Sequence, residues 1–72
     1  SSVNRLRYIL DHMTQAHDDC GFEARINGDF INFCVTRDGE TLMKSYGHVE
    51  FARLSMSTIE NEITALVEGM RE

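Results

Sequence analysis

The sequence is poor in basic residues and has no cluster of them. It contains 7 Lys and Arg residues against 12 Asp and Glu, so its net charge at pH 7 is −5. Lys and Arg side chains supply the attraction to phosphates that drives most non-specific nucleic-acid binding. The composition therefore disfavours direct binding of DNA or RNA.

Cysteines are few, and long apolar runs are lacking. Cys20 and Cys34 share no C-x-x-C unit, and with four methionines they suit a reducing compartment and free thiols; a single disulfide is the alternative. No stretch approaches the roughly eighteen apolar residues of a membrane helix, and the first residues lack the charged-then-apolar pattern of a signal peptide. We expect a cytoplasmic protein with no membrane partner.

Signatures of catalysis are also lacking. No H-E-x-x-H, G-x-S-x-G or glycine-rich phosphate loop is present. Residues of reactive or metal-binding type gather at one place only: His12, His17, Asp18, Asp19 and Cys20. On a helix, the spacing of the two histidines and of the two adjacent carboxylates makes each pair diverge. A thiolate nucleophile would need Cys20 beside His17 or His48. We expect no enzyme, no metal site and no cofactor.

What the chain does contain is the composition of an ordinary globular protein. Of its 72 residues, 42% are hydrophobic and 26% are charged. A chain of this length has room for one domain, here residues 1–72, and buries a smaller share of its surface than a larger chain would. Self-association is therefore expected.

Two tight-turn dipeptides, Asn27-Gly28 and Asp38-Gly39, enclose an apolar-rich run. Such dipeptides favour two-residue hairpin turns, because both central positions need positive φ. They predict a three-stranded antiparallel meander in which Ile26 faces Asp29 and Arg37 faces Glu40. The alternating side chains place an expected core on one face, with Lys44 beside it: Phe22, Ala24, Ile26, Ile31, Phe33 and Val35. A bulged loop ending in Gly39 is the alternative for the second turn.

Helical patterns flank these strands. Apolar residues in the first twenty positions recur at spacings of three and four, which predicts a helix ending near Asp19. Ser57 and Glu60 have the S-x-x-E spacing of a capping box, and the apolar spacing after them predicts a helix over about residues 58–71. Residues 48–52 fit either a short fourth strand or a helical lead-in.

These elements predict an α+β fold in the order α-β-β-β-α, with the two helices packed antiparallel on one face of the sheet. Arg5 and Arg7 lie at the positive end of the first helix, and Asp18 and Asp19 lie at its negative end, so both pairs oppose the helix dipole. Antiparallel packing would compensate them with opposite charges from the last helix. Contact of these residues with a partner is the other interpretation.

The face opposite the expected core carries more apolar side chains than a solvated face should. Phe30, Cys34 and Met43 fall there, with Arg25 and Asn32 at the edge. Either one helix covers each face in three layers, or the apolar residues form a docking surface rimmed by polar groups. We favour the second reading. It predicts a small non-enzymatic interaction protein (a regulator, adaptor or inhibitor) that binds another protein and forms a homodimer.

Two other functions remain as alternatives. An acidic mimic of nucleic acid would present carboxylates in place of phosphates: Asp18, Asp19, Glu60, Glu62, Glu68 and Glu72. A weak nucleic-acid binder would have to gather Arg5, Arg7, Arg25, Lys44 and Arg53 on one surface. The element order is also that of double-stranded-RNA-binding domains, whose last helix begins with basic residues. Here residues 57–62 are acidic, so no family is assigned.

Overall fold

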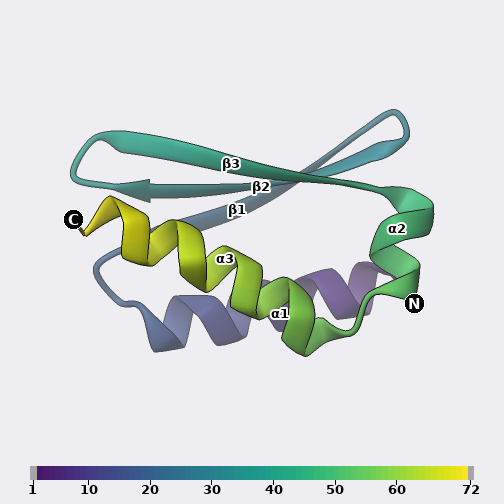
Figure 1. Ribbon diagram of the computed structural model, residues 1–72, viewed down its shortest axis with the longest axis horizontal. Helices are drawn as coiled ribbons and strands as arrows, with labels where there is room; N and C mark the ends of the chain where they lie inside the picture. The colour runs from purple at the N-terminus through teal and green to yellow at the C-terminus, as the bar shows by residue number, and fades with distance from the viewer. Residues whose placement is uncertain (1, 72) are drawn as a thin grey trace.

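A computed structural model describes residues 2–71 and has the element order that the sequence predicts (Figure 1). Three strands form one antiparallel sheet in the order β1-β2-β3. Helices precede and follow this sheet, which confirms the predicted α+β fold. The elements in chain order are α1 (Ser2–Ala16), β1 (Gly21–Asn27), β2 (Phe30–Arg37), β3 (Glu40–Gly47), α2 (His48–Arg53) and α3 (Met56–Met70).

The turn between β2 and β3 has the predicted register. Arg37 pairs with Glu40, which leaves Asp38 and Gly39 as a two-residue turn. Both turn residues have positive φ, 50° and 80°, as a type I′ turn requires. The bulged alternative is therefore wrong.

The turn between β1 and β2 lies one residue further along the chain than predicted. Gly28 and Asp29 form it, with Asn27 opposite Phe30. Only Gly28 has positive φ (59°), which is typical of a type II′ turn with glycine first. The predicted pairing of Ile26 with Asp29 is wrong, because Ile26 pairs with Ile31. The pairing is therefore displaced by two residues along β2. Because side chains alternate with a period of two, each one stays on its predicted face.

Residues 48–52 do not form a fourth strand; they belong to the short helix α2. The Glu50 carboxylate accepts a hydrogen bond from the Gly47 N–H at 3.2 Å, which satisfies a free donor at the start of this helix. Phe51 is buried and packs near the rings of Phe33 and Tyr46, with centroids 6.1 and 6.4 Å away. The helical lead-in, the other reading of this segment, is confirmed.

Both long helices differ from their predicted limits. Ser55 caps α3, because its Oγ accepts a hydrogen bond from the Thr58 N–H at 3.1 Å, so the helix begins before the predicted Ser57 cap. α1 ends at Ala16 rather than near Asp19. The early end leaves Asp19 outside the helix, where its carboxylate does not oppose the helix dipole.

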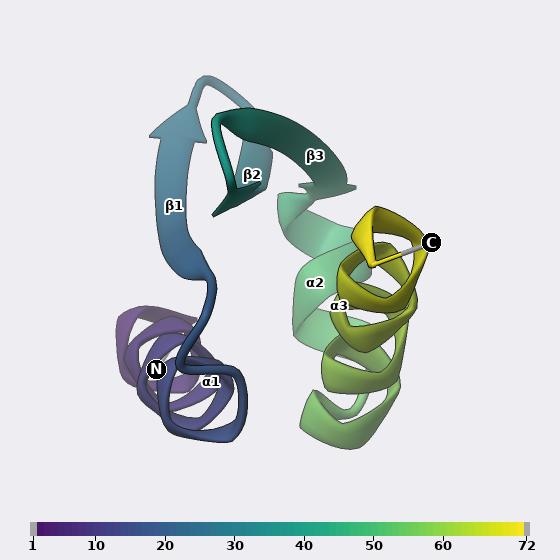
Figure 2. The ribbon, with the colours of Figure 1, turned by 90° about the vertical axis from the view of Figure 1, so that its left-hand side faces the viewer.

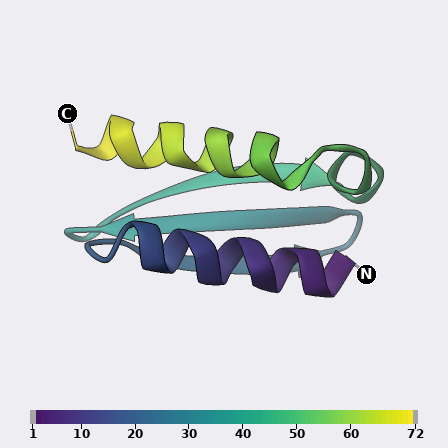
Figure 3. The same ribbon diagram turned by 90° about the horizontal axis from the view of Figure 1, so that it is seen from below.

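The two long helices lie on the same face of the sheet, but they run in the same direction (Figure 3). Arg5 near the start of α1 contacts the Leu54 carbonyl just before α3, and Asp19 after α1 contacts Arg71 after α3. The predicted antiparallel packing is therefore wrong. Three antiparallel strands separate the helices, and each connection reverses the chain, so an odd number of strands leaves first and last helices parallel.

The core lies between the sheet and the helices (Figure 2). Within it, Ile31, Phe33 and Val35 are buried as predicted, whereas Phe22 and Ala24 are half-buried. Ile26 is 59% exposed, because the β1–β2 turn lies away from the helix layer (Figure 1). The buried residues are Ile9, Met13, Ile31, Phe33, Val35, Tyr46, Phe51, Ile59, Ile63 and Val67.

Candidate functional site

The sheet has one face covered by helices and one face that they leave open. Figure 2 shows α1, α2 and α3 on the same side of the three strands. We call the other side the outer face. The three-layer arrangement, with one helix on each face, does not occur. The side chains on the outer face belong to even-numbered residues of β2 and to odd-numbered residues of β1 and β3.

Three of these side chains form the outer apolar patch, defined as Phe30, Cys34 and Met43. Phe30 is 54% exposed and Met43 is 59% exposed, while Cys34 on the central strand is half-buried and pairs with Met43. Phe30 lies between Asn27 and Gly47 in the register. A side chain built on Gly47 would meet no atom within 4 Å, so the space beside Phe30 is open.

Polar pairs surround the outer apolar patch. Arg25 donates a hydrogen bond to Glu23 at 2.6 Å, and this interaction raises the pKa of the guanidinium. Ser45 Oγ donates to Asn32 Oδ1, also at 2.6 Å. Arg25 and Asn32 are opposite each other in the register, so the structure brings both predicted rim residues together next to the patch. An apolar centre with a satisfied polar rim is typical of a protein interface.

Several of the acidic residues proposed as one surface have partners within the chain. Glu60 Oε2 lies 2.6 Å from His12 Nδ1, and Glu62 accepts a hydrogen bond from the Tyr46 hydroxyl at 2.5 Å. Asp19 is held by two arginines, whereas Asp18 and Glu68 are exposed. Glu72 lies outside the described residues. Three of the five described carboxylates therefore have internal partners.

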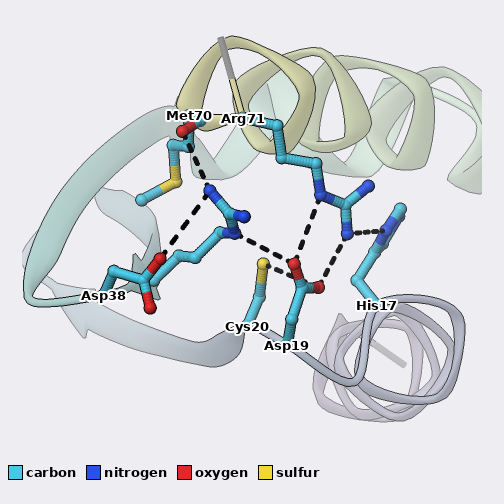
Figure 4. Close-up of polar contacts among 7 residues, drawn as sticks. His17, Asp19, Cys20, Asp38, Met70 and Arg71 are labelled. Carbon is cyan, nitrogen blue, oxygen red and sulfur yellow. Dashed lines mark hydrogen bonds and ion pairs between the residues drawn. The ribbon is translucent and has the colours of Figure 1, made fainter.

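Asp19 joins the ends of three elements (Figure 4). Arg71 Nη2 donates to its Oδ1 at 2.7 Å, and Arg37 Nε donates to its Oδ2 at 2.9 Å. Arg37 also donates to the Met70 carbonyl at 3.1 Å. The hydrogen bond from Arg71, followed by that from Arg37, holds the pKa of Asp19 well below its usual range. The compensation that the sequence predicts for Asp19 is therefore intramolecular, but it comes from the end of α3 rather than from its start.

The side chains next to Cys20 and His17 are a carboxylate and an arginine. Cys20 and Cys34 are free thiols, as predicted. Burial and the adjacent carboxylate of Asp19, 3.6 Å from the sulfur, raise the pKa of Cys20, so its thiol stays protonated at neutral pH. His17 Nδ1 lies 3.5 Å from Arg71 rather than beside this thiol. Across residues 2–71, no three His, Cys, Asp or Glu side chains are arranged to hold a metal ion.

The basic residues are dispersed. Arg5 donates to the Phe51 carbonyl of α2 and to the Leu54 carbonyl that follows it. Arg25 lies on the outer face, and Lys44 lies on the covered face with its Nζ 5.5 Å from the Tyr46 ring. Arg53 is exposed on α2. These residues do not form a single surface for a phosphate backbone.

One shallow concavity runs along α1. Its lining residues come from a single helix and are all exposed: Tyr8, Asp11, His12 and Gln15. A hollow of this kind does not enclose a ligand, because binding sites bury most of a small molecule's surface.

Three residues with structural roles were missed or misplaced at the sequence level. Tyr46 and Phe51 are buried, but Gly47 interrupts the periodicity that would have revealed them. Arg5 was grouped with Arg7 as a helix-end charge, and no local pattern distinguishes the two. The outer apolar patch, in contrast, followed from strand alternation alone.

Comparisons with known proteins gave no match: no family model, no curated protein and no solved structure is significantly similar to the chain. None of the helices within residues 2–71 has the length and hydrophobicity of a membrane span. The functional interpretation consequently depends on the geometry of the outer face.

Proposed function

We propose that this chain is a non-enzymatic protein-interaction module that docks through the outer apolar patch and forms a homodimer. The observation that supports this proposal is the open outer face, on which Phe30 and Met43 are each more than half exposed. A solvated sheet face is normally polar, and exposed apolar patches rimmed by polar residues mark interaction sites.

The charge of the outer face favours a second copy as the occupant. The whole chain carries a net charge of −5, which opposes self-association. On the outer face, however, the charged residues are Glu23 and Arg25, which pair with each other at 2.6 Å. Two outer faces can therefore meet without facing like charges. The helices lie on the opposite side, so two sheets could stack at the usual spacing of about 10 Å.

Sedimentation equilibrium of the Phe30→Asp variant tests this proposal. A two-fold dimer contains two copies of Phe30, and burial of the exposed half of one ring, about 100 Å², contributes up to about 2.5 kcal/mol. The two rings together contribute up to about 5 kcal/mol, and a loss of little more than half of that raises the dimer Kd by about 100-fold, which is the change we expect. Thermal unfolding at equal protein concentration should show that the variant still folds, because Phe30 is outside the core.

Two further variants sharpen the test. Tyr8→Asp is the matched control, since Tyr8 is equally exposed (55%) but lies on α1, and it should leave the dimer unchanged. Gly47→Glu adds a side chain to the open space beside Phe30 at an extended backbone position (φ −67°, ψ 154°), so it should block docking and leave the fold intact. A wild-type chain that stays monomeric at millimolar concentration would refute the homodimer, as would equal effects of Phe30→Asp and Tyr8→Asp.

A further inference from the structure

The outer edge of β1 presents unpaired backbone groups. Asn27 and Phe30 close a two-residue hairpin, so odd-numbered residues of β1 bond to β2, and the N–H and C=O groups of Phe22, Ala24 and Ile26 point outward. On β2, odd-numbered residues bond to β3 instead. The hydrogen bond from the His48 N–H to the Asp29 carbonyl, at 2.9 Å, fits this alternation, because Asp29 is odd-numbered and the bond is on the β3 side. Within residues 2–71, no backbone hydrogen bond outside the sheet reaches Phe22, Ala24 or Ile26.

This edge is long and regular. β1 has seven residues, contains no proline, and pairs with β2 at every position without a bulge. Natural edge strands are commonly shortened, bulged or covered to prevent further pairing. Ile26 also leaves apolar surface at this edge, because it is 59% exposed on the side of the sheet that faces the helices.

The two charged residues of β1 define what could pair with it. Glu23 and Arg25 flank Ala24 and are both exposed, and an ion pair between such exposed side chains contributes little to stability. An antiparallel strand whose centre lies opposite Ala24 would place one residue opposite Glu23 and another opposite Arg25, at close non-hydrogen-bonded positions. A basic residue opposite Glu23 and an acidic residue opposite Arg25 would complement both charges.

We infer that the β1 edge binds an extended segment of another protein by antiparallel strand addition. The segment has apolar residues opposite Phe22, Ala24 and Ile26, a basic residue opposite Glu23 and an acidic residue opposite Arg25. Backbone hydrogen bonds supply the affinity, and the charged pairs set the register. This site shares Glu23 and Arg25 with the rim of the outer apolar patch, but it uses the backbone edge of β1 rather than Phe30, Cys34 and Met43 and does not depend on the homodimer.

A second copy of the chain does not fit this edge, although its own β1 has the complementary sequence. α1 packs beneath β1 (Figure 2). Antiparallel pairing of two β1 strands about a two-fold axis would bring the two α1 helices to nearly the strand spacing of about 4.8 Å. Packed helices need about 8–10 Å between their axes. The occupant is therefore a strand that carries no helix beneath it.

A capped synthetic peptide with the β1 sequence, GFEARIN, serves as the probe, because residues 21–27 are self-complementary about Ala24 in the antiparallel register. Titration into the isotope-labelled chain, followed by amide NMR shifts and hydrogen exchange, should protect the amides of Phe22, Ala24 and Ile26. The matched control peptide, GFRAEIN, exchanges the two charges and places like charges opposite each other. It should bind about tenfold more weakly.

The protein variant that combines Glu23→Arg with Arg25→Glu should reverse this preference, binding the exchanged peptide better than GFEARIN. Both substituted side chains are exposed, so the fold should be retained. The inference is overturned if neither peptide binds at millimolar concentration, or if both bind equally. It is also overturned if the shifts concentrate on Phe30 and Met43, or if the chain alone protects the β1 edge by self-association.

Discussion

Replacement of Arg5 by alanine should destabilise the domain, whereas the same change at Arg7 should not. The Arg5 guanidinium donates hydrogen bonds to the carbonyl oxygens of Phe51, at 2.9 Å, and of Leu54, and it stacks over the Phe51 ring at 4.9 Å. These contacts tie the start of α1 to the end of α2, where a positive charge is favourable. Arg7, two residues further along, is exposed.

The magnitude follows from the interactions that are lost. A hydrogen bond to a charged group contributes about 1.5–3 kcal/mol, and an exposed cation–π contact contributes about 0.5–1 kcal/mol. Arg5 is only half-buried, so solvent weakens each of these. We expect Arg5→Ala to lower the free energy of unfolding by about 2–3 kcal/mol, a large share of the roughly 4–11 kcal/mol typical of a chain of 72 residues. Arg7→Ala should change it by less than about 0.5 kcal/mol.

Urea denaturation followed by circular dichroism measures these changes. With a slope near 1 kcal/mol per molar urea, Arg5→Ala should lower the midpoint by about 2–3 M and Arg7→Ala should leave it in place. Arg5→Lys keeps the charge but loses the planar fork that reaches two carbonyls, so it should recover less than half of the loss. Equal midpoints for the two alanine variants, or complete recovery with lysine, would refute the reasoning.

Three other perturbations have defined outcomes. Tyr46→Phe removes a hydroxyl that donates to an α3 carboxylate at 2.5 Å, and should lower the free energy of unfolding by about 1–2 kcal/mol in the urea assay; no loss would contradict this role. Arg71 helps to lower the folded pKa of Asp19. The stability that Asp19 contributes is present above its unfolded pKa near 4 and is lost as pH falls through the lower folded pKa. Asp19→Asn should therefore flatten the acid side of the pH–stability profile. An unchanged profile would contradict this role of Asp19. Gly39→Ala, at φ 80°, should cost about 1 kcal/mol in thermal unfolding, whereas Gly47→Ala, at φ −67°, should cost nothing; equal losses would contradict the turn geometry.

The sheet was predictable because its signals are local. Positive φ at Gly28 and Gly39 fixes where the chain reverses, and alternation along β2 fixes the face of each side chain. The position of the first turn was wrong by one residue, yet the faces were right because the pairing shifted by an even number. The same locality explains the outer apolar patch, whose members Phe30 and Cys34 were identified from alternation alone.

Other features depended on contacts between distant segments. Tyr46 precedes Gly47 and Phe51 lies four residues after it, and neither belongs to a periodic run. Both are buried because they pack near Phe33. Arg5 bonds to carbonyls 46 and 49 residues away, which no spacing rule could indicate. The parallel direction of the helices, in contrast, follows from counting the chain reversals, and was available from the sequence.

Local sequence signals were sufficient for the α-β-β-β-α order, the two faces of the sheet and the apolar residues on the outer face, because torsional preferences and strand alternation act over a few residues. Long-range packing places both helices on one side of the sheet and leaves the outer face open. It also brings Asp19 to Arg37 and Arg71 and leaves the β1 edge uncovered. These outcomes depend on which surfaces pack together, and packing joins residues that no local pattern relates.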